Sequence, residues 1–434
     1  MKNIKLSILL GAVFSMCACN SNVNSLKGAT LLREPKTTSD AHYSDEFNSF
    51  KEKLKVFSNK FSESFIKNQF EDGKNIAVSP LSLEMCLGLA ICGSNGTTRQ
   101  ELLNAFDMDY ETFIKNYSRL YANSNLKEES NGGSDMFEIM LRNSIWIDDN
   151  VKLKESGLDA LRDKCYCYSY ETDFNSKKAN EAIAKFIELE TKGLIKPTLN
   201  FDPRTLFTLI NTLYLKDIWN DTGSDLYFSN NPEHYFINSD KTKSSKKLLQ
   251  AYYHGGKAIS NNDYSSFFTL TENGFKIYFV KPNEGKDIKS VFNKEAMGFV
   301  LDTKNYVYTD DEKKEHYETR CLFPEFNADC DVDLIPILSQ DFDIKALFDS
   351  EKCDFSNLSE DPVFCKELKQ ISKLDVNKKG IEGAAVTYMA MNGTAGPGEY
   401  TIVSEDFVVN KEFGFILTYQ DAVLFSGVVS NIDK

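Results

Sequence analysis

The side chains best suited to acid-base or nucleophilic chemistry are few and scattered. The four histidines lie in no catalytic motif: His42, His234, His254 and His316. The chain has no Gly-x-Ser-x-Gly nucleophile elbow, no His-Glu-x-x-His zinc motif and no glycine-rich phosphate-binding motif. Most carboxylates fall in mixed-charge stretches, which more often form solvated surface than a paired acid and base. The sequence therefore offers no residues for an enzyme mechanism and no cofactor site.

The cysteines are the other reactive side chains. Those beyond the N-terminal segment are Cys86, Cys92, Cys165, Cys167, Cys321, Cys330, Cys353 and Cys365. Their spacings do not form a small-domain disulfide framework. Cys165-Tyr166-Cys167 would place two thiols on one side of an expected strand, but no histidine is close enough in sequence to complete a zinc site. We expect structural thiols and no metal, and the sequence leaves the disulfide pairing open.

The N-terminal residues have the character of an export signal. Two lysines precede the apolar stretch Leu6 to Phe14, which has signal-peptide length and is too short to span a membrane. The run Met16-Cys17-Ala18-Cys19 resembles a bacterial lipobox, in which the chain is cut before a cysteine whose thiol then carries lipid. We expect residues 1–18 to be a signal peptide and Cys19 to be lipidated. The alternative is a cleaved secretory signal without lipid.

Residues 19–45 then form a tether. They are rich in Asn, Ser, Thr and Lys and show no apolar periodicity, which favours a flexible segment. We expect an exported lipoprotein at the periplasmic or cell-surface side of a membrane, or a secreted protein if no lipid is attached.

The composition is that of a soluble globular protein. Of 434 residues, 41% are hydrophobic and 26% charged, which is enough apolar material for a sizeable core. The formal charge of -14 argues against nucleic acid as the main partner, because binding a phosphate backbone needs a basic face. We expect a monomer whose domain covers residues 46–434.

The order of the expected elements predicts an α+β domain. Apolar residues from Phe47 to Phe65 recur at three- and four-residue steps and predict an amphipathic helix, and further helices are expected within 81–106, 155–164 and 178–193. The expected strands are Met140 to Ile147, Cys165 to Tyr170, Leu206 to Leu215, Gly274 to Val280, Thr401 to Val409 and pieces of Phe413 to Val429. Helices come early and strands late, without regular alternation, which favours α+β over a doubly wound fold.

Four segments together resemble the serpin family over roughly residues 46–434. They are Asn75 to Ser82, Leu209 to Trp219, the block from Phe323-Pro324-Glu325-Phe326 to Cys353-Asp354-Phe355-Ser356, and Leu374 to Lys434. The resemblance implies helices packed on large mixed or antiparallel sheets with an exposed reactive-centre loop. It also implies that Ser79, Ser82 and Asn211 lie where the two halves of the main sheet part, with Trp219 near the top of that opening.

The resemblance also implies that one segment is a loop hinge, which must enter the middle of the sheet. These residues are Gly380, Ile381, Glu382, Gly383, Ala384, Ala385, Val386 and Thr387. Alternate side chains become buried on insertion, and the inward set is uncharged and free of proline: Ile381, Gly383, Ala385, Thr387, Met389 and Met391. The chain departs from the family pattern in three ways: Lys378-Lys379 replace an acidic pair, Ile381 replaces a common Thr, and Gln370 replaces a common His.

The family's spacing from Gly380 implies that the scissile bond lies between Thr394 and Ala395, with Met391, Asn392 and Tyr400 as alternative sites. The expected function is suicide inhibition of a peptidase, either an elastase-like serine peptidase or a papain-like cysteine peptidase. A non-inhibitory serpin that binds a ligand or partner, or a surface protein that uses the fold as a scaffold, remains the alternative.

Overall fold

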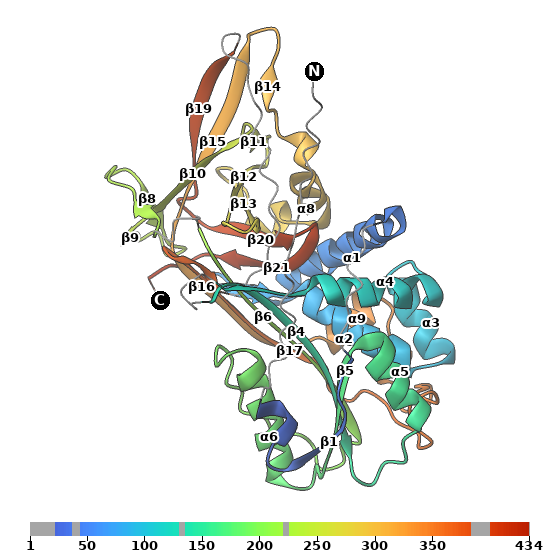
Figure 1. Ribbon diagram of the computed structural model, residues 1–434. Coiled ribbons are helices and arrows are strands. Elements are labelled where there is room, and N and C mark those ends of the chain that lie inside the picture. Colours follow the sequence, from blue (N-terminus) through green and yellow to red (C-terminus); the bar gives the residue numbers. More distant parts are fainter. Residues whose placement is uncertain (1–21, 37–43, 130–134, 220–224, 383–399, 434) are drawn as a thin grey trace, which may run out of the picture.

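Long strands run through the molecule, and most of the helices gather on one side of them (Figure 1). The computed structural model describes residues 22–36, 44–129, 135–219, 225–382 and 400–433. Helices pack on large sheets, so the expectation of an α+β fold is confirmed.

The first long helix, α1, shows how local sequence sets an element. The stripe of phenylalanines is buried on one face, and the Ser44 hydroxyl accepts a hydrogen bond from Phe47 N at 3.2 Å, which caps the helix. The α-helices of the described residues are α1 Asp45–Gln69, α2 Pro80–Gly93, α3 Gly96–Ala105, α4 Tyr110–Asn123, α5 Glu155–Cys165, α6 Lys177–Glu190, α7 Ile288–Val291, α8 Lys294–Leu301 and α9 Ile335–Asp341. Short 3-10 turns are η1 Asn22–Ser25, η2 Thr303–Asn305 and η3 Ala346–Phe348.

The largest sheet has 14 strands. In spatial order they are β1 Ala29–Arg33, β5 Cys167–Thr172, β4 Asp135–Asp148, β6 Phe207–Ile218, β18 Gly380–Glu382, β17 Lys369–Asn377, β16 Phe326–Asp333, β2 Ile76–Val78, β21 Ala422–Val429, β20 Phe413–Tyr419, β13 Lys276–Pro282, β12 Tyr264–Leu270 and β11 Ile259–Ser260, with β3 Asn125–Glu129 on β4. Its strands differ in burial: β20 and β21 are buried nearly throughout, whereas β17 alternates between buried and more exposed residues.

A second sheet contains β14 Thr309–Asp310, β15 Glu315–Phe323, β10 Leu249–Gly255 and β7 Tyr227–Phe228, with β19 Thr401–Val408 parallel to β15. A small sheet pairs β8 Tyr235–Ile237 with β9 Lys243–Lys247. In Figure 1 the second sheet lies at one end of the molecule, and the middle of the large sheet lies between α6 on one face and α2 on the other.

Residues 22–36 depart from the expected tether. Strand β1 pairs antiparallel with β5 at the sheet edge, and Val23 in η1 is fully buried in a small core with Trp146 and Tyr170. The folded part of the chain therefore begins before residue 46, because these residues find partners more than a hundred positions away in sequence.

The expected strand across Cys165, Tyr166 and Cys167 is also wrong in its first residues. Cys165 is the last residue of α5, and Tyr166 takes a left-handed conformation with φ of 50° that ends the helix before β5 begins at Cys167. The two thiols therefore do not share one face of a strand.

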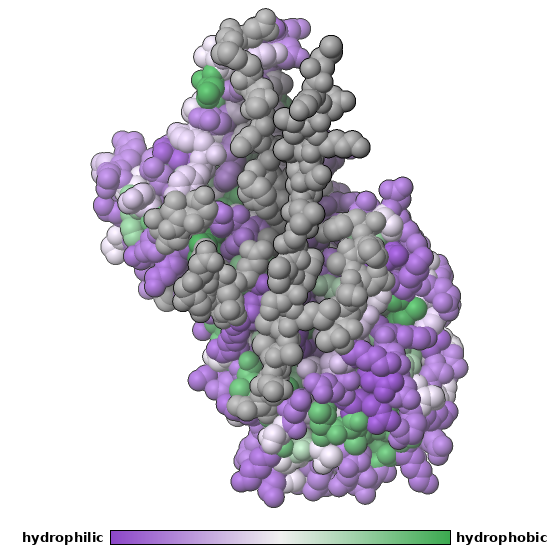
Figure 2. Space-filling model, viewed as in Figure 1, coloured by the Kyte–Doolittle hydropathy of each residue, from purple (hydrophilic) through white to green (hydrophobic). Residues whose placement is uncertain are grey.

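The described surface visible in Figure 2 is mainly hydrophilic. Most of the large apolar side chains are instead buried in the core. None of the helices in the part of the chain that the structure describes combines the length and the apolar character needed to cross a membrane.

Candidate functional site

The centre of the large sheet contains a slot between β6 and β17. At one end of the slot, β18 pairs antiparallel with both strands: Ile381 lies opposite Asp217 on β6 and Val376 on β17. Beyond Glu382, β6 pairs only with β4 and β17 pairs only with β16 among the described residues. The two facing edges therefore carry backbone donors and acceptors that no described strand satisfies, which is the arrangement that accepts an added strand.

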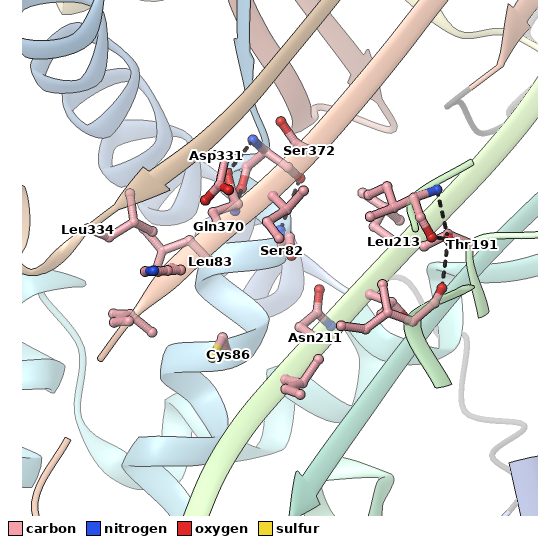
Figure 3. Close-up of a pocket in the computed structure, with 18 of the residues that line it drawn as sticks. Ser82, Leu83, Cys86, Thr191, Asn211, Leu213, Asp331, Leu334, Gln370 and Ser372 are labelled. Atoms are coloured by element: carbon pink, nitrogen blue, oxygen red, sulfur yellow. Dashed lines mark hydrogen bonds between the residues drawn. The ribbon is translucent and has the colours of Figure 1, made fainter. Parts of the chain in front are cut away.

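A cavity of about 200 Å³ occupies this slot (Figure 3). Its walls come from residues 208–213 of β6 and from residues 367–373, which lead into and begin β17. Its floor comes from α2, and its cover from the end of α6 and residues 194–201. In Figure 3, Ser82 and Cys86 of α2 lie between the two separated strands, and Thr191 lies beside β6. The space is therefore bounded by three separate parts of the chain.

The start of α2 is fastened to β17. Ser79 caps the helix by accepting a hydrogen bond from Ser82 N at 3.2 Å, and Pro80 occupies its first turn. Gln370 accepts a hydrogen bond from Ser79 N at 2.8 Å and donates one to Ser79 O at 2.9 Å. The neutral side-chain amide of Gln370 donates one bond and accepts the other. Unlike the bonds of an imidazole ring, these two bonds do not depend on the protonation state of the side chain.

The opposite wall holds a polar group without a partner. Asn211 donates to Asn143 Oδ1 at 2.9 Å, but its own Oδ1 is buried and has no hydrogen-bond partner among the described residues. The hydroxyl oxygen of Thr212 is likewise buried and has no hydrogen-bond partner among the described residues. A buried acceptor that stays unpaired costs roughly 1–3 kcal/mol, so this wall is stabilised by any added donor.

Trp219 lies where the slot is closed by β18. It is buried against Phe323, with ring centroids 5.4 Å apart, and its indole nitrogen donates to Asn377 O at 2.6 Å. The Trp219 backbone N–H also donates to Lys379 O at 3.3 Å. These contacts hold the turn that leads into β18.

Glycine is required at the first residue of β18. A Cβ atom on Gly380 would lie 1.8 Å from the carbonyl oxygen of Asp217. At the other end of β18, Tyr214 donates its hydroxyl hydrogen bond to Glu382 Oε1 at 3.0 Å. The close backbone approach and this bond fix the register of the three residues.

Lysine at 378 has its own acidic partners. Its Nζ lies 2.7 Å from Asp225 Oδ2, and its backbone N–H donates to Glu325 Oε1 at 2.8 Å. The hydrogen bond and charge of Asp225 raise the pKa of Lys378. The basic residue at this position is therefore matched by acidic groups on neighbouring segments.

Asp217 adds a titratable group beside Gly380. Burial raises its pKa to about 6, although its carboxylate accepts hydrogen bonds from Ile218 N and from both nitrogens of Asn273. No sequence motif marked this residue. In the sequence, Gln370 was notable only as a departure from the family pattern. Thr191 could not be predicted to line the slot, because its place there depends on how α6 packs over the slot.

Several expected site residues lie outside the described residues. These are the hinge positions Gly383, Ala384, Ala385, Val386 and Thr387, the bond between Thr394 and Ala395, and Cys19. The described hinge residues Gly380, Ile381 and Glu382 form β18, and Ser79, Ser82 and Asn211 line the slot.

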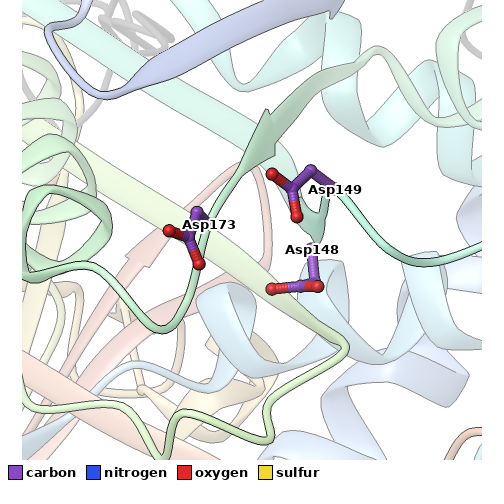
Figure 4. A group of neighbouring side chains, drawn as sticks. All are labelled: Asp148, Asp149 and Asp173. Atoms are coloured by element: carbon purple, nitrogen blue, oxygen red, sulfur yellow. The ribbon is translucent and has the colours of Figure 1, made fainter.

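One carboxylate cluster lies away from the slot (Figure 4). Asp148, Asp149 and Asp173 have carboxylate oxygens within 4.8 Å of one another, the one such group found in the described part of the chain. Asp148 accepts hydrogen bonds from Asn150 N and Phe174 N, and Asp173 accepts one from Asn175 N. These bonds shape two loops and account for the cluster without a metal ion.

Comparisons with known proteins place this architecture. The family model described as Serpin (serine protease inhibitor) matches residues 52–432. Serine protease inhibitor 88Ea of Drosophila melanogaster is 24% identical over 379 residues, which is 83% of this chain and 86% of the relative.

Solved structures agree in fold. The native state of the thermophilic serpin tengpin superposes with a TM-score of 0.70 at 17% identity and covers 93% of this chain and 100% of its own. Thyroxine-binding globulin in complex with thyroxine gives a TM-score of 0.67 at 16% identity and covers 89% and 100%. At these identities the structures establish the fold alone.

Proposed function

The chain belongs to the serpin family, and from that premise we propose that it inhibits a peptidase by offering a loop bond as substrate and then inserting the cut loop into the slot between β6 and β17. The observation that carries the proposal is β18, which already pairs with both walls and defines the register in which a longer strand would continue.

The register assigns partners to the residues that follow. In an antiparallel ladder each further residue of the incoming strand meets the preceding residue of both neighbours. Continued from Glu382, Ala385 would face Leu213 and Thr387 would face Asn211. The edge of β6 extends to Phe207, which gives room for the strand to grow to about residue 391.

The direction in which the side chains of β17 and β18 point supports the same insertion. Gln370, Ser372, Leu374 and Val376 of β17 are buried and alternate with more exposed residues. Ile381 pairs with Val376 and is itself buried, so positions at two-residue steps after it would turn inward. Those positions carry small or uncharged side chains, which the cavity between the walls accommodates.

The chemical step is an acyl transfer that stops halfway. The serine hydroxyl or cysteine thiol of the peptidase attacks the carbonyl carbon of Thr394, and the amine of Ala395 leaves with a proton. An ester or thioester then joins the peptidase to Thr394. Insertion to about residue 391, nine residues beyond Glu382, would add roughly 30 Å of strand and carry this bond to the far end of the slot. Inhibition requires that this displacement be faster than hydrolysis of the acyl bond.

The slot provides a driving force for insertion. Each added residue satisfies backbone groups on the open edges of β6 and β17, and a donor opposite Asn211 would satisfy its buried oxygen. The segment after α6 must move aside before the loop can insert, because Thr191 and residues 194–201 lie over the cavity.

The experiment mixes the full chain with an elastase-like serine peptidase and, separately, with a papain-like cysteine peptidase. We expect an adduct that survives denaturing electrophoresis, together with a released C-terminal peptide whose first residue is Ala395. A peptide that begins after Met391, Asn392 or Tyr400 would move the bond while keeping the mechanism. Clean cleavage without an adduct across a broad peptidase panel would instead assign the chain to the non-inhibitory serpins.

We also propose that the protein is exported and held at a membrane by a lipid on Cys19. The sequence signals of residues 1–19 support this, and the folded part begins shortly after them at η1. Expression in a bacterial host with detergent partitioning tests it. Cys19→Ser should shift the protein to the aqueous phase, whereas Cys17→Ser should not, and equal behaviour of the two variants would favour a secretory signal without lipid.

A further inference from the structure

A second cavity lies at the end of the slot farthest from β18. It has a volume of about 150 Å³ and is lined by the first residues of β6, by the segment that leads into β17, and by Cys86, Leu87 and Ala90 of α2. Phe207 packs edge-on against Phe355 in its wall, with ring centroids 5.1 Å apart. The cavity is therefore largely apolar, and both sides of the slot contribute to it.

The register of β18 leads an inserted strand to this cavity. Because β18 pairs antiparallel with β6 and with β17, each further residue of the strand would meet the preceding residue of both neighbours. Continued in this register, Met389 would lie opposite Leu209 on one side and Leu368 on the other. Both leucines line the cavity.

Met391 is the next residue on the same face of the strand. The same register would place it between Phe207 and Lys366, which also line the cavity. We propose that the cavity is the binding site for the side chains of Met389 and Met391 when the loop inserts. This assignment rests on the proposed function and names the contacts that hold the far end of the inserted strand.

Both methionine side chains would point to the face of the sheet on which the cavity lies. Gln370 of β17 bonds to the backbone of Ser79 at the start of α2, so the buried face of β17 looks toward α2. Ile381 is buried opposite Val376, which shares that face. Residues at two-residue steps after Ile381 keep the same direction.

A methionine side chain suits a cavity of this size and lining. An apolar cavity of about 150 Å³ accommodates a benzene-sized group, and the flexible thioether fills irregular space and makes favourable contacts with aromatic rings. Phe207 and Phe355 supply such rings. A charged side chain at position 389 would instead be buried against apolar walls.

An ion cluster closes the slot just beyond the cavity. Asp202, which precedes β6, accepts hydrogen bonds from Arg204 Nη2 at 2.8 Å and from Lys366 Nζ. Because Lys366 precedes β17, this carboxylate joins the two sides of the slot. The slot therefore has a fixed end, and Met391 is the last inward residue that it accepts.

The first experiment uses a fluorescein-labelled synthetic peptide with the sequence of residues 383–392, added to the full chain without any peptidase. Fluorescence anisotropy measures its dissociation constant. We expect the unsubstituted peptide to bind, the Met389→Ala peptide to bind about tenfold more weakly or worse, and the Met391→Ala peptide to bind several-fold more weakly. The Tyr388→Ala peptide is the control, because that side chain points to the other face, and its affinity should change by less than about threefold.

A variant of the protein locates the bound methionine. Ala90→Leu adds a side chain to the wall of the cavity, and it should weaken binding of the unsubstituted peptide and remove its advantage over the Met389→Ala peptide. Ala160→Leu in α5 is the matched control and should preserve both affinities. No binding of the unsubstituted peptide, or equal affinities of all four peptides, would overturn the proposal even if Ala90→Leu fails to fold.

The second experiment follows the loop of the chain itself. Intact chain and chain cut beyond Met391 are treated with dilute hydrogen peroxide, and mass spectrometry quantifies the sulfoxide at each methionine. We expect Met389 and Met391 to oxidise several-fold more slowly after the cut, whereas the partly buried Met108, outside the slot, oxidises at the same rate in both.

The two experiments separate this proposal from the inhibitory function. A cut chain that melts at a higher temperature than the intact chain, yet oxidises both methionines at an unchanged rate, would overturn the cavity assignment and leave loop insertion in place. Peptide binding with the expected dependence on Met389, but no adduct with any peptidase, would count against inhibition and support the cavity assignment.

Discussion

The side-chain amide of Gln370 binds both backbone polar groups of Ser79, accepting from its N–H at 2.8 Å and donating to its carbonyl at 2.9 Å. This pair of bonds joins the strand on one side of the slot to the first turn of the helix beneath it. It makes position 370 a structural connection between elements that are nearly three hundred residues apart in sequence.

Removing this amide should destabilise the protein measurably. Gln370→Ala leaves the buried Ser79 N–H without a partner and removes one of two hydrogen bonds to Ser79 O, which still accepts from Leu83 N at 3.3 Å. We expect a loss of about 1–3 kcal/mol in the free energy of unfolding. Denaturant unfolding followed by circular dichroism measures it. Gln100→Ala, on an exposed side chain of α3, should change this free energy by less than ~0.5 kcal/mol. Equal effects of the two substitutions would show that the Ser79 bonds contribute nothing specific.

The alternation of the inserting strand makes a second prediction. Thr387→Arg would place a charge opposite Asn211 in the interior of the sheet, whereas Val386→Arg would point to the other face. We expect the first variant to be cleaved as a substrate with little or no adduct, and the second to keep most of its adduct yield. Quantitative gel densitometry after mixing with the peptidase measures both. The reverse order of effects would mean that the register of β18 does not continue.

Glycine at 380 makes a third prediction. Gly380→Ala would bring a methyl group against the backbone of Asp217, so β18 should be displaced and the free energy of unfolding should fall by about 1–3 kcal/mol. Gly298→Ala in α8 is the matched control, because the nearest atom to its added Cβ is 3.7 Å away. That helical change should be neutral or stabilising by up to about 1 kcal/mol. A neutral Gly380→Ala would argue against the close approach.

The pH dependence of stability should carry the signature of Glu84. This carboxyl group is buried in α2 beside the Ser58 hydroxyl at 2.5 Å, and burial raises its pKa from 4.5 to about 8. Between these two values the folded state holds a proton that the unfolded state has released, so stability is greatest at low pH and falls as the pH rises. The fall is on the order of 5 kcal/mol over the full interval.

Glu84→Gln tests this assignment because the amide keeps the shape and cannot ionise. We expect a shallower decline of the free energy of unfolding between pH 5 and pH 8, measured by denaturant unfolding, with the variant more stable than the wild type at the upper end. Buried Asp217 and half-buried Glu412 have raised pKa values of about 6 and about 7 and leave some slope in place. The exposed Glu111→Gln is the control, and an equal change of slope in both variants would contradict the role of Glu84.

Elements with a regular apolar pattern were predictable from the sequence. The phenylalanine stripe of α1 and the apolar runs of β4, β6 and β20 indicate a helix and three strands, because large apolar residues recur along each of these elements. Four ordered motifs were enough to indicate the family, which the comparison then confirmed.

Strand β17 could not be recognised in the same way. Its inward face includes Gln370 and Ser372, which are buried because they bond to the backbone of Ser79 and Ala77. A polar buried face hides the alternation that normally marks a strand, and its partners lie far away in sequence. Strand β1 could not be predicted for a related reason. It is a short segment within a polar stretch, and its strand partner is the distant β5.

The sequence by itself determined the family, the α+β class and the uncharged alternation of the hinge, because side-chain type and local spacing carry that information. Only the tertiary structure decided that β18 pairs with β6 and that Lys378 is matched by Asp225. Each of these is a contact between residues distant in sequence. Their proximity follows from how the whole sheet and its helices pack, which no local pattern encodes.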